Sequence, residues 1–105
     1  MAVRVEEVAK ANVRSLGSAT VDQMIRAADS IVANIAEGYG RGVSRDGLRF
    51  FTFARSSADE LEAHLRLAGM KRRLPQELAT DLVGNTRRVG FLVFRYAESV
   101  ERRRK

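Results

Sequence analysis

The sequence has a single histidine, and it is the first side chain to consider for chemistry. His64 follows Glu60 by four residues, so both side chains would lie on one face of a helix. Di-metal carboxylate bundles need a Glu-x-x-His motif on each of two helices, and zincins need two histidines. The sequence therefore predicts no metal site and no cofactor. It favours a pair in which Glu60 orients His64 in a polar pocket or at an interface.

A glycine-rich segment, residues 38–42, is the next candidate, because backbone N–H groups ahead of a helix can cradle a phosphate. The segment follows a predicted helix rather than a strand, and no Gly-Lys-Ser/Thr ending is present. The spacing therefore indicates an interhelical turn and not a nucleotide site. Arg41 and Arg45 in this turn would be free to meet a phosphate.

Hydrolytic chemistry has little support in the sequence. Ser56 and Ser57 fall in the middle of a predicted helix rather than on a strained elbow, and no second base accompanies them. Asp59, Glu60 and Glu62 occupy different faces of the same helix. We therefore expect a protein that is not an enzyme.

Basic side chains are the stronger candidates for function. The chain has 19 Lys and Arg against 13 Asp and Glu, a formal charge of +6, which favours a polyanionic partner such as RNA or DNA. The alternative is that the charge serves solubility alone. No RNA-recognition signature with an aromatic platform is present, so binding would use the phosphate backbone. The candidate nucleic-acid-binding residues are Arg41, Arg45, Lys71, Arg72, Arg73, Arg88, Arg95, Arg102 and Arg103.

Three of these arginines share one side of the last predicted helix. Arg88, Arg95 and Arg102 recur every seven residues. Glu98 can pair with Arg95 and Arg102 and would reduce part of this positive field. The Lys71–Arg73 run lies at the opposite end of the same helix, so the sequence predicts two separate basic clusters.

Helices must position these residues, because apolar side chains recur at spacings of three and four and no window alternates as a strand would. The pattern predicts four helices over residues 3–16, 19–39, 45–71 and 75–102. Gly17 would end the first helix, and Ser44 would cap the third. Short connections favour an antiparallel up-and-down four-helix bundle, an all-α fold in a single domain over residues 1–105.

Two of the predicted helices carry more apolar surface than one bundle seam needs. Residues 45–71 have a second row beside the main one, consisting of Phe50, Phe53, Ser57, His64 and Leu67. In residues 75–102, Phe91 and Phe94 lie off the inner row, which is Leu78, Leu82, Val89, Leu92, Val93, Tyr96 and Val100. The first helix, at about 21 Å against about 40 Å for the third, would leave part of the core uncovered. These features predict oligomerisation, unless the third helix is simply the central one of its bundle.

Composition also indicates the cellular compartment in which the protein is expected. There is no cysteine, which excludes disulfides, thiolate nucleophiles and Cys-based metal sites. No apolar run approaches the length of a membrane span, and the first residues lack the apolar stretch of a secretory signal. We expect a cytoplasmic protein with no membrane contact.

Two segments resemble a known family. Residues 30–41, Ser-Ile-Val-Ala-Asn-Ile-Ala-Glu-Gly-Tyr-Gly-Arg, are similar to the signature of the four-helix-bundle proteins encoded in intervening sequences of bacterial 23S ribosomal RNA genes. Residues 51–65, Phe-Thr-Phe-Ala-Arg-Ser-Ser-Ala-Asp-Glu-Leu-Glu-Ala-His-Leu, are similar to the third-helix pattern of that family. The chain departs from the pattern at Val32, where many members have Pro, at Ser56, where Gly is usual, and in its short first helix.

The resemblance implies a cyclic homopentamer without catalytic residues. It also implies kinship with the accessory variability determinant of diversity-generating retroelements, a basic pentamer that binds nucleic acid and a reverse transcriptase. Residues of the shared motif have a structural interpretation, in which a polar cluster fixes the pairing of the second and third helices. The motif residues are Asn34, Glu37, Gly38, Ser57 and Glu60.

Together these observations predict a non-enzymatic, basic homo-oligomer that binds RNA or DNA through phosphates. The alternative is a protein-interaction scaffold whose charge is incidental, such as an accessory subunit that docks a reverse transcriptase.

Overall fold

The structure is a computed structural model that describes residues 1–104, and over that range it contains five α-helices and no strand. The all-α prediction is confirmed. The three long helices begin and end within two residues of their predicted bounds. The elements are α1 (Ala2–Ala11), α2 (Val13–Leu16), α3 (Ser18–Gly40), α4 (Arg45–Met70) and α5 (Gln76–Arg104).

The prediction of one continuous first helix is wrong, because the chain breaks at Asn12. This residue has φ −113° and ψ 24°, outside helical values. Its side-chain amide donates to the carbonyl of Val8 at 2.9 Å, and Ser15 Oγ donates to the Asn12 carbonyl at 3.1 Å. Short polar side chains compete with the backbone for its hydrogen bonds, which explains the split into α1 and α2. Gly17, with φ 87°, then turns the chain into α3.

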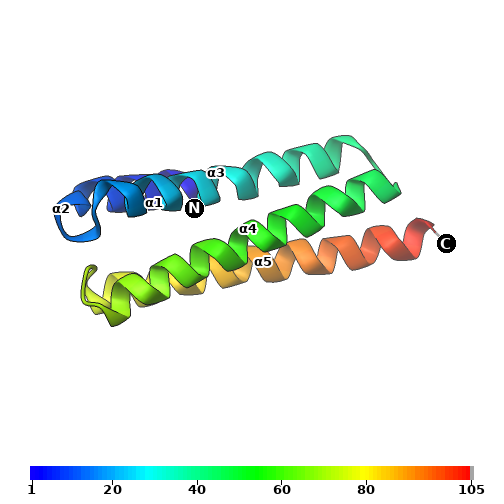
Figure 1. The fold of residues 1–105 in the computed structure, drawn as a ribbon. Coiled ribbons are helices and arrows are strands. Elements are labelled where there is room, and N and C mark those ends of the chain that lie inside the picture. Colours follow the sequence, from blue (N-terminus) through cyan, green and yellow to red (C-terminus); the bar gives the residue numbers. More distant parts are fainter. Residues whose placement is uncertain (105) are drawn as a thin grey trace.

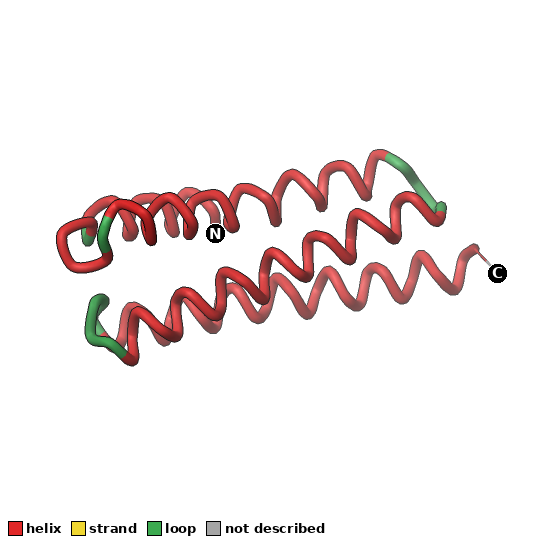
Figure 2. The backbone as a smooth tube through the Cα atoms, viewed as in Figure 1, coloured by secondary structure: helices red, strands yellow, loops and turns green. Residues whose placement is uncertain are grey.

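The helices α3, α4 and α5 lie side by side and alternate in direction (Figure 1). The connecting turns lie at the two ends of an elongated molecule (Figure 2), whose principal extents are 49, 20 and 16 Å. Ser44 caps α4 as predicted, because its Oγ accepts a hydrogen bond from Gly47 N at 3.0 Å. The chain therefore folds back after each long helix, which brings the ends of α3 and α5 to the same end of the rod.

The apolar core has two parts. The larger cluster includes Val5 and Ala9 of α1 together with side chains of α3, α4 and α5. The smaller cluster, with Phe51, Val93 and Val100, lies toward the α3–α4 turn and contains no residue of α1 or α2. The helices α1 and α2, which we call the first arm, therefore cover only one half of the rod. The short length predicted for the first helix implied this.

Two residues of the predicted inner row of α5 are exposed, which corrects that part of the prediction. Leu92 is 59% exposed and Tyr96 is 38% exposed. Both face the half of the rod that α1 does not reach. No helix among residues 1–104 combines the length and the apolar character needed to cross a membrane.

Candidate nucleic-acid interface

The structure divides the predicted basic residues between the two ends of the molecule and the side of α5. Arg41 and Arg45 lie at the α3–α4 turn, where the C-terminal end of α5 brings Arg102 and Arg103 (Figure 1). We call these four residues the distal cluster. Tyr39 and Tyr96, from α3 and α5, stack with ring centroids 6.0 Å apart, which ties the two helix ends together.

Pairing within the chain neutralises only part of the distal cluster. The Arg41 guanidinium lies 3.3 Å from a Glu37 oxygen and 3.5 Å from an Asp46 oxygen. Within residues 1–104, Arg45 and Arg102 form no ion pair. Ion pairs of exposed groups contribute little to stability, so these arginines remain available to an external anion.

A second basic cluster, Lys71, Arg72 and Arg73, lies at the α4–α5 turn. Arg72 has φ 57°, the left-handed region that favours glycine. The carbonyl of Arg73 accepts a hydrogen bond from Ser15 Oγ at 2.7 Å, which fastens this turn to the α2 end of the molecule. One copy of the chain therefore holds its two basic clusters at opposite ends of the rod, as the sequence predicted.

Between the two basic clusters, the exposed side of α5 carries arginines. Arg88 and Arg95 are exposed, and α5 has no Asp or Glu between Asp81 and Glu98. Arg95 Nε lies 3.7 Å from Glu98, whereas Arg88 makes no ion pair within residues 1–104. The expected pairing of Glu98 with Arg102 does not occur among the described residues.

Exposed and half-buried aromatic rings have arginine guanidinium groups over their faces, an arrangement that sequence interpretation missed. The guanidinium carbon of Arg41 lies 5.0 Å from the centre of Phe50, and that of Arg55 lies 4.7 Å from Phe94. Arg95 lies over Phe91, four residues away on α5, at 5.8 Å. The helical spacing could have indicated only this last pair, because the other two join residues whose proximity depends on the fold.

Arg103 shows the same arrangement at the end of α5. Its guanidinium carbon lies 5.9 Å from the ring centre of Tyr96. Its Nε also donates a long hydrogen bond of 3.5 Å to the carbonyl of Ser99. The distal cluster thus includes two arginines that cover aromatic rings, Arg41 and Arg103.

Residues of the family motif form part of the contact between α3 and α4, which we call the motif seam. Asn34 Nδ2 donates to Ser30 Oγ at 3.0 Å and to the Ser30 carbonyl at 2.8 Å. The hydroxyls of Ser30 and Ser57 lie 2.8 Å apart, so Ser30 connects Asn34 to α4. The structure therefore joins Asn34 and Ser57 through a residue that the prediction left out.

The two glutamates of the motif point elsewhere. Glu37 pairs with Arg41 one turn later on the chain. Glu60 lies 2.6 Å from Arg26 of α3 and 3.7 Å from His64 Nε2. The expected polar cluster is therefore split between separate contacts. Sequence spacing alone could not identify Arg26 as the partner of Glu60. Both glutamates are engaged in ion pairs on the molecular surface rather than aimed into a cavity.

Gly38, the last motif residue, is buried where the ring of Phe51 packs. A Cβ at position 38 would lie 2.7 Å from Cε1 of that ring, far below van der Waals contact. In the glycine-rich segment, Gly38 therefore has a packing role, whereas Gly42, with φ 65°, serves the turn into α4. Within residues 1–104, no three His, Cys, Asp or Glu side chains gather closely enough to hold a metal ion.

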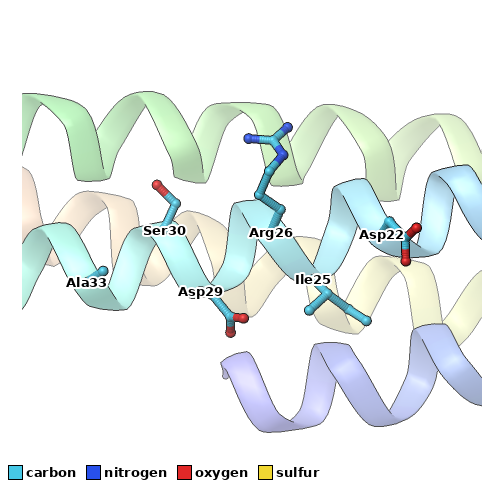
Figure 3. Close-up of a pocket in the computed structure, with 6 residues that line it drawn as sticks. All are labelled: Asp22, Ile25, Arg26, Asp29, Ser30 and Ala33. Carbon is cyan, nitrogen blue, oxygen red and sulfur yellow. The ribbon is translucent and has the colours of Figure 1, made fainter.

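A depression lies on the surface of α3 (Figure 3). Its six lining residues, Asp22, Ile25, Arg26, Asp29, Ser30 and Ala33, all belong to one helix. In Figure 3, Arg26 points toward α4, and Asp29 points toward α1. With a single wall and no converging groups, this surface offers no enclosed binding site.

Comparison with known families identifies the family of this chain. The family model described as 23S rRNA-intervening sequence protein matches residues 1–94. The chain belongs to this family. The matched region contains all of α1 to α4 and most of α5, so it includes both the motif seam and the α4–α5 turn. Neither the curated proteins nor the solved structures include a match to this chain.

Proposed function

We propose that the chain forms a cyclic homopentamer that binds RNA or DNA through phosphate contacts and has no catalytic activity. In this assembly each subunit is a four-helix bundle, with α1 and α2 together forming its first arm. One observation carries the proposal. Exposed arginines and lysines line both ends and one side of the rod, and most of them have no carboxylate partner within residues 1–104.

The free cations support a phosphate-binding surface. Arg88 makes no ion pair within the described chain, and neither do Arg45 and Arg102 of the distal cluster. The formal charge of one subunit is +6, and a pentamer carries five times that charge. Because each neutralised phosphate releases counterions, affinity should fall steeply as salt increases, with little sequence preference.

Two unlike aromatic patches support assembly into a ring. The α4 patch consists of Phe50 and Phe53, whose rings meet edge to face with centroids 5.8 Å apart. Phe53 precedes Ser57 by one turn, and Ser57 contacts α3, so this patch lies on the α3 side of α4.

The α5 patch consists of Phe91 and Phe94, which border a hollow with Arg55 and Ala58 of α4. It therefore lies on the opposite side of α4 from the α4 patch. Exposed aromatic surface of this kind is typical of subunit contacts. Two different patches on one subunit suit a head-to-tail contact, and such contacts form a ring when the rotation from one subunit to the next closes.

Charge reversal on α5 tests nucleic-acid binding. The double variant Arg88→Glu and Arg95→Glu is titrated against a fluorescein-labelled single-stranded RNA and a labelled DNA duplex, with anisotropy as the readout at two salt concentrations. The control is Lys10→Glu with Arg14→Glu, which makes the same change in net charge on the first arm. We expect the α5 variant to lose about tenfold or more in affinity, and the control to lose much less.

Two results contradict this proposal. The first is affinity that does not change between low and high salt. The second is equal loss of affinity in the α5 variant and the control, which would indicate a general charge effect. If the α5 variant retains nucleic acid but loses a protein that co-purifies with the wild-type chain, the scaffold function is supported instead.

A further inference from the structure

An apolar groove lies between α3 and α5 in the half of the rod that α1 does not cover. Its volume is about 330 Å³. Tyr39, on its α3 side, is 69% exposed, and Leu92, on its α5 side, is 59% exposed. The side chains that form it are Ile35, Tyr39, Phe51, Leu92, Val93 and Tyr96. The groove is thus an open apolar surface with walls from two long helices and a floor from α4.

The groove lies in line with the surface of α3 and α5 on which α1 packs. Arg4 of α1 reaches Asp81 of α5 at 2.6 Å, and Val5 is buried in the main core, so α1 rests on α3 and α5 together. The first residues of α1 lie beside Asp29 of α3. Figure 1 shows α3 and α5 running on past the N-terminus, where α4 is the one other helix beside them.

Apolar side chains continue this surface beyond the end of α1 on both α3 and α5. On α3, Val32 is 50% exposed, and Ile35 and Tyr39 follow at helical spacing. On α5, Leu92 and Tyr96 lie opposite them. The uncovered stretch from Asp29 to Tyr39 is about ten residues or 15 Å of helix. Its shape and length therefore match a second short helix placed end to end with α1.

The α5 edge of the groove is positively charged. Arg88 and Arg95 flank Leu92 at four and three residues along α5, and the Arg103 guanidinium lies over Tyr96. On α3, residues 30–36 carry no charged side chain at all. Acidic groups on an occupant would therefore meet arginines along the α5 edge and no opposing carboxylate on that stretch of α3.

We propose that this groove binds an amphipathic helix of a partner protein, apolar on one face and acidic along its flanks. A second copy of the chain is a poor occupant, because two arginine-edged grooves would repel each other. Nucleic acid is also a poor occupant, because apolar walls offer no partner to a desolvated phosphate. The groove shares Arg88, Arg95 and Arg103 with the surface proposed to bind phosphates, but its apolar contacts are its own, so peptide binding and oligonucleotide binding can each fail alone.

The intrinsic fluorescence of the two tyrosines can report binding at this site. It contains two tyrosines and no tryptophan, and both tyrosines line the groove. The probe is a stapled helical peptide of about 14 residues without aromatic residues, with Leu at positions i, i+3, i+4 and i+7 and Glu on both flanks. The matched peptide has Lys in place of every Glu.

We expect the acidic peptide to change tyrosine emission to saturation and to shield the tyrosines from acrylamide, with about tenfold weaker binding of the Lys peptide. Leu92→Glu should abolish the response, because it places a negative charge among the apolar contacts. Val13→Glu is the control, an exposed apolar residue on α2 changed in the same way. Thermal melts by circular dichroism check that both variants remain folded.

The proposal is overturned if the two peptides bind equally, if neither binds, or if Leu92→Glu leaves binding intact. Shielding of the tyrosines that rises with protein concentration alone would assign the groove to a second copy, and an oligonucleotide that shields both tyrosines from acrylamide as fully as the peptide does would assign it to nucleic acid. Either result also overturns the proposal.

Discussion

Gly38 of α3 lies directly against the ring of Phe51 of α4, so close that a Cβ at position 38 would be 2.7 Å from Cε1. The contact lies just before the α3–α4 turn, where Phe51 also meets Tyr96 of α5 at 5.3 Å between centroids. One absent methyl group therefore allows three helices to pack together at the end of the rod that lacks α1.

Replacing Gly38 with Ala should destabilise the fold. The added methyl group must displace the aromatic ring, and overpacking of this kind costs about 1–3 kcal/mol in the free energy of unfolding. Chemical denaturation followed by circular dichroism measures the change. Gly84→Ala is the control, because nothing lies within 4 Å of a Cβ at that helical position. It should gain up to about 1 kcal/mol, and a Gly38→Ala variant that also gains would contradict the packing role.

The hydroxyl contact between Ser30 and Ser57 can be tested with an adjacent serine as control. Ser57→Ala removes the partner at 2.8 Å and should cost about 1 kcal/mol of stability. Ser56→Ala, on the exposed side of the same helix, should be neutral or slightly stabilising because Ala is the better helix former. Equal effects of the two changes in urea denaturation would show that the seam hydroxyls do not fix the pairing of α3 with α4.

Arg72 adopts a left-handed backbone conformation, φ 57°, that glycine enters more easily. Arg72→Gly should therefore raise the unfolding free energy by up to about 1 kcal/mol, once relief of strain is set against the greater freedom of the unfolded chain. Arg73→Gly, at a position without positive φ, should lower it. Differential scanning calorimetry distinguishes the two, and a lower melting temperature for Arg72→Gly would contradict strain at this turn.

Local pattern was enough to predict the long helices. Apolar spacing determined the extents of α3, α4 and α5, and the hydroxyl of Ser44 marked where α4 begins, because caps and periodicity are properties of nearby residues. The break at Asn12 was missed, since its hydrogen bond to Val8 competes only slightly with continued helix. Such a small energetic preference leaves no clear sign in the residue pattern.

The candidate site was harder to predict, because its contacts join helices that are far apart in the sequence. Arg26 with Glu60 and Arg55 with Phe94 depend on how helices rotate against each other. The exposure of Leu92 has a similar origin. Its helical phase places it on the inner row, but whether that row is covered depends on the length of another helix.

The final prediction concerns how subunits meet. Phe53→Glu disrupts the α4 patch, and Phe91→Glu disrupts the α5 patch, while both side chains are exposed enough for the fold to survive. If the α4 patch of one subunit contacts the α5 patch of the next, neither variant can close a ring, and each alone should be monomeric. An equimolar mixture should form a dimer and nothing larger, because the two intact patches make one contact. Light scattering coupled to size-exclusion chromatography measures these masses. Dimers in either variant alone would instead mean that like patches pair, a symmetry that cannot generate a five-membered ring.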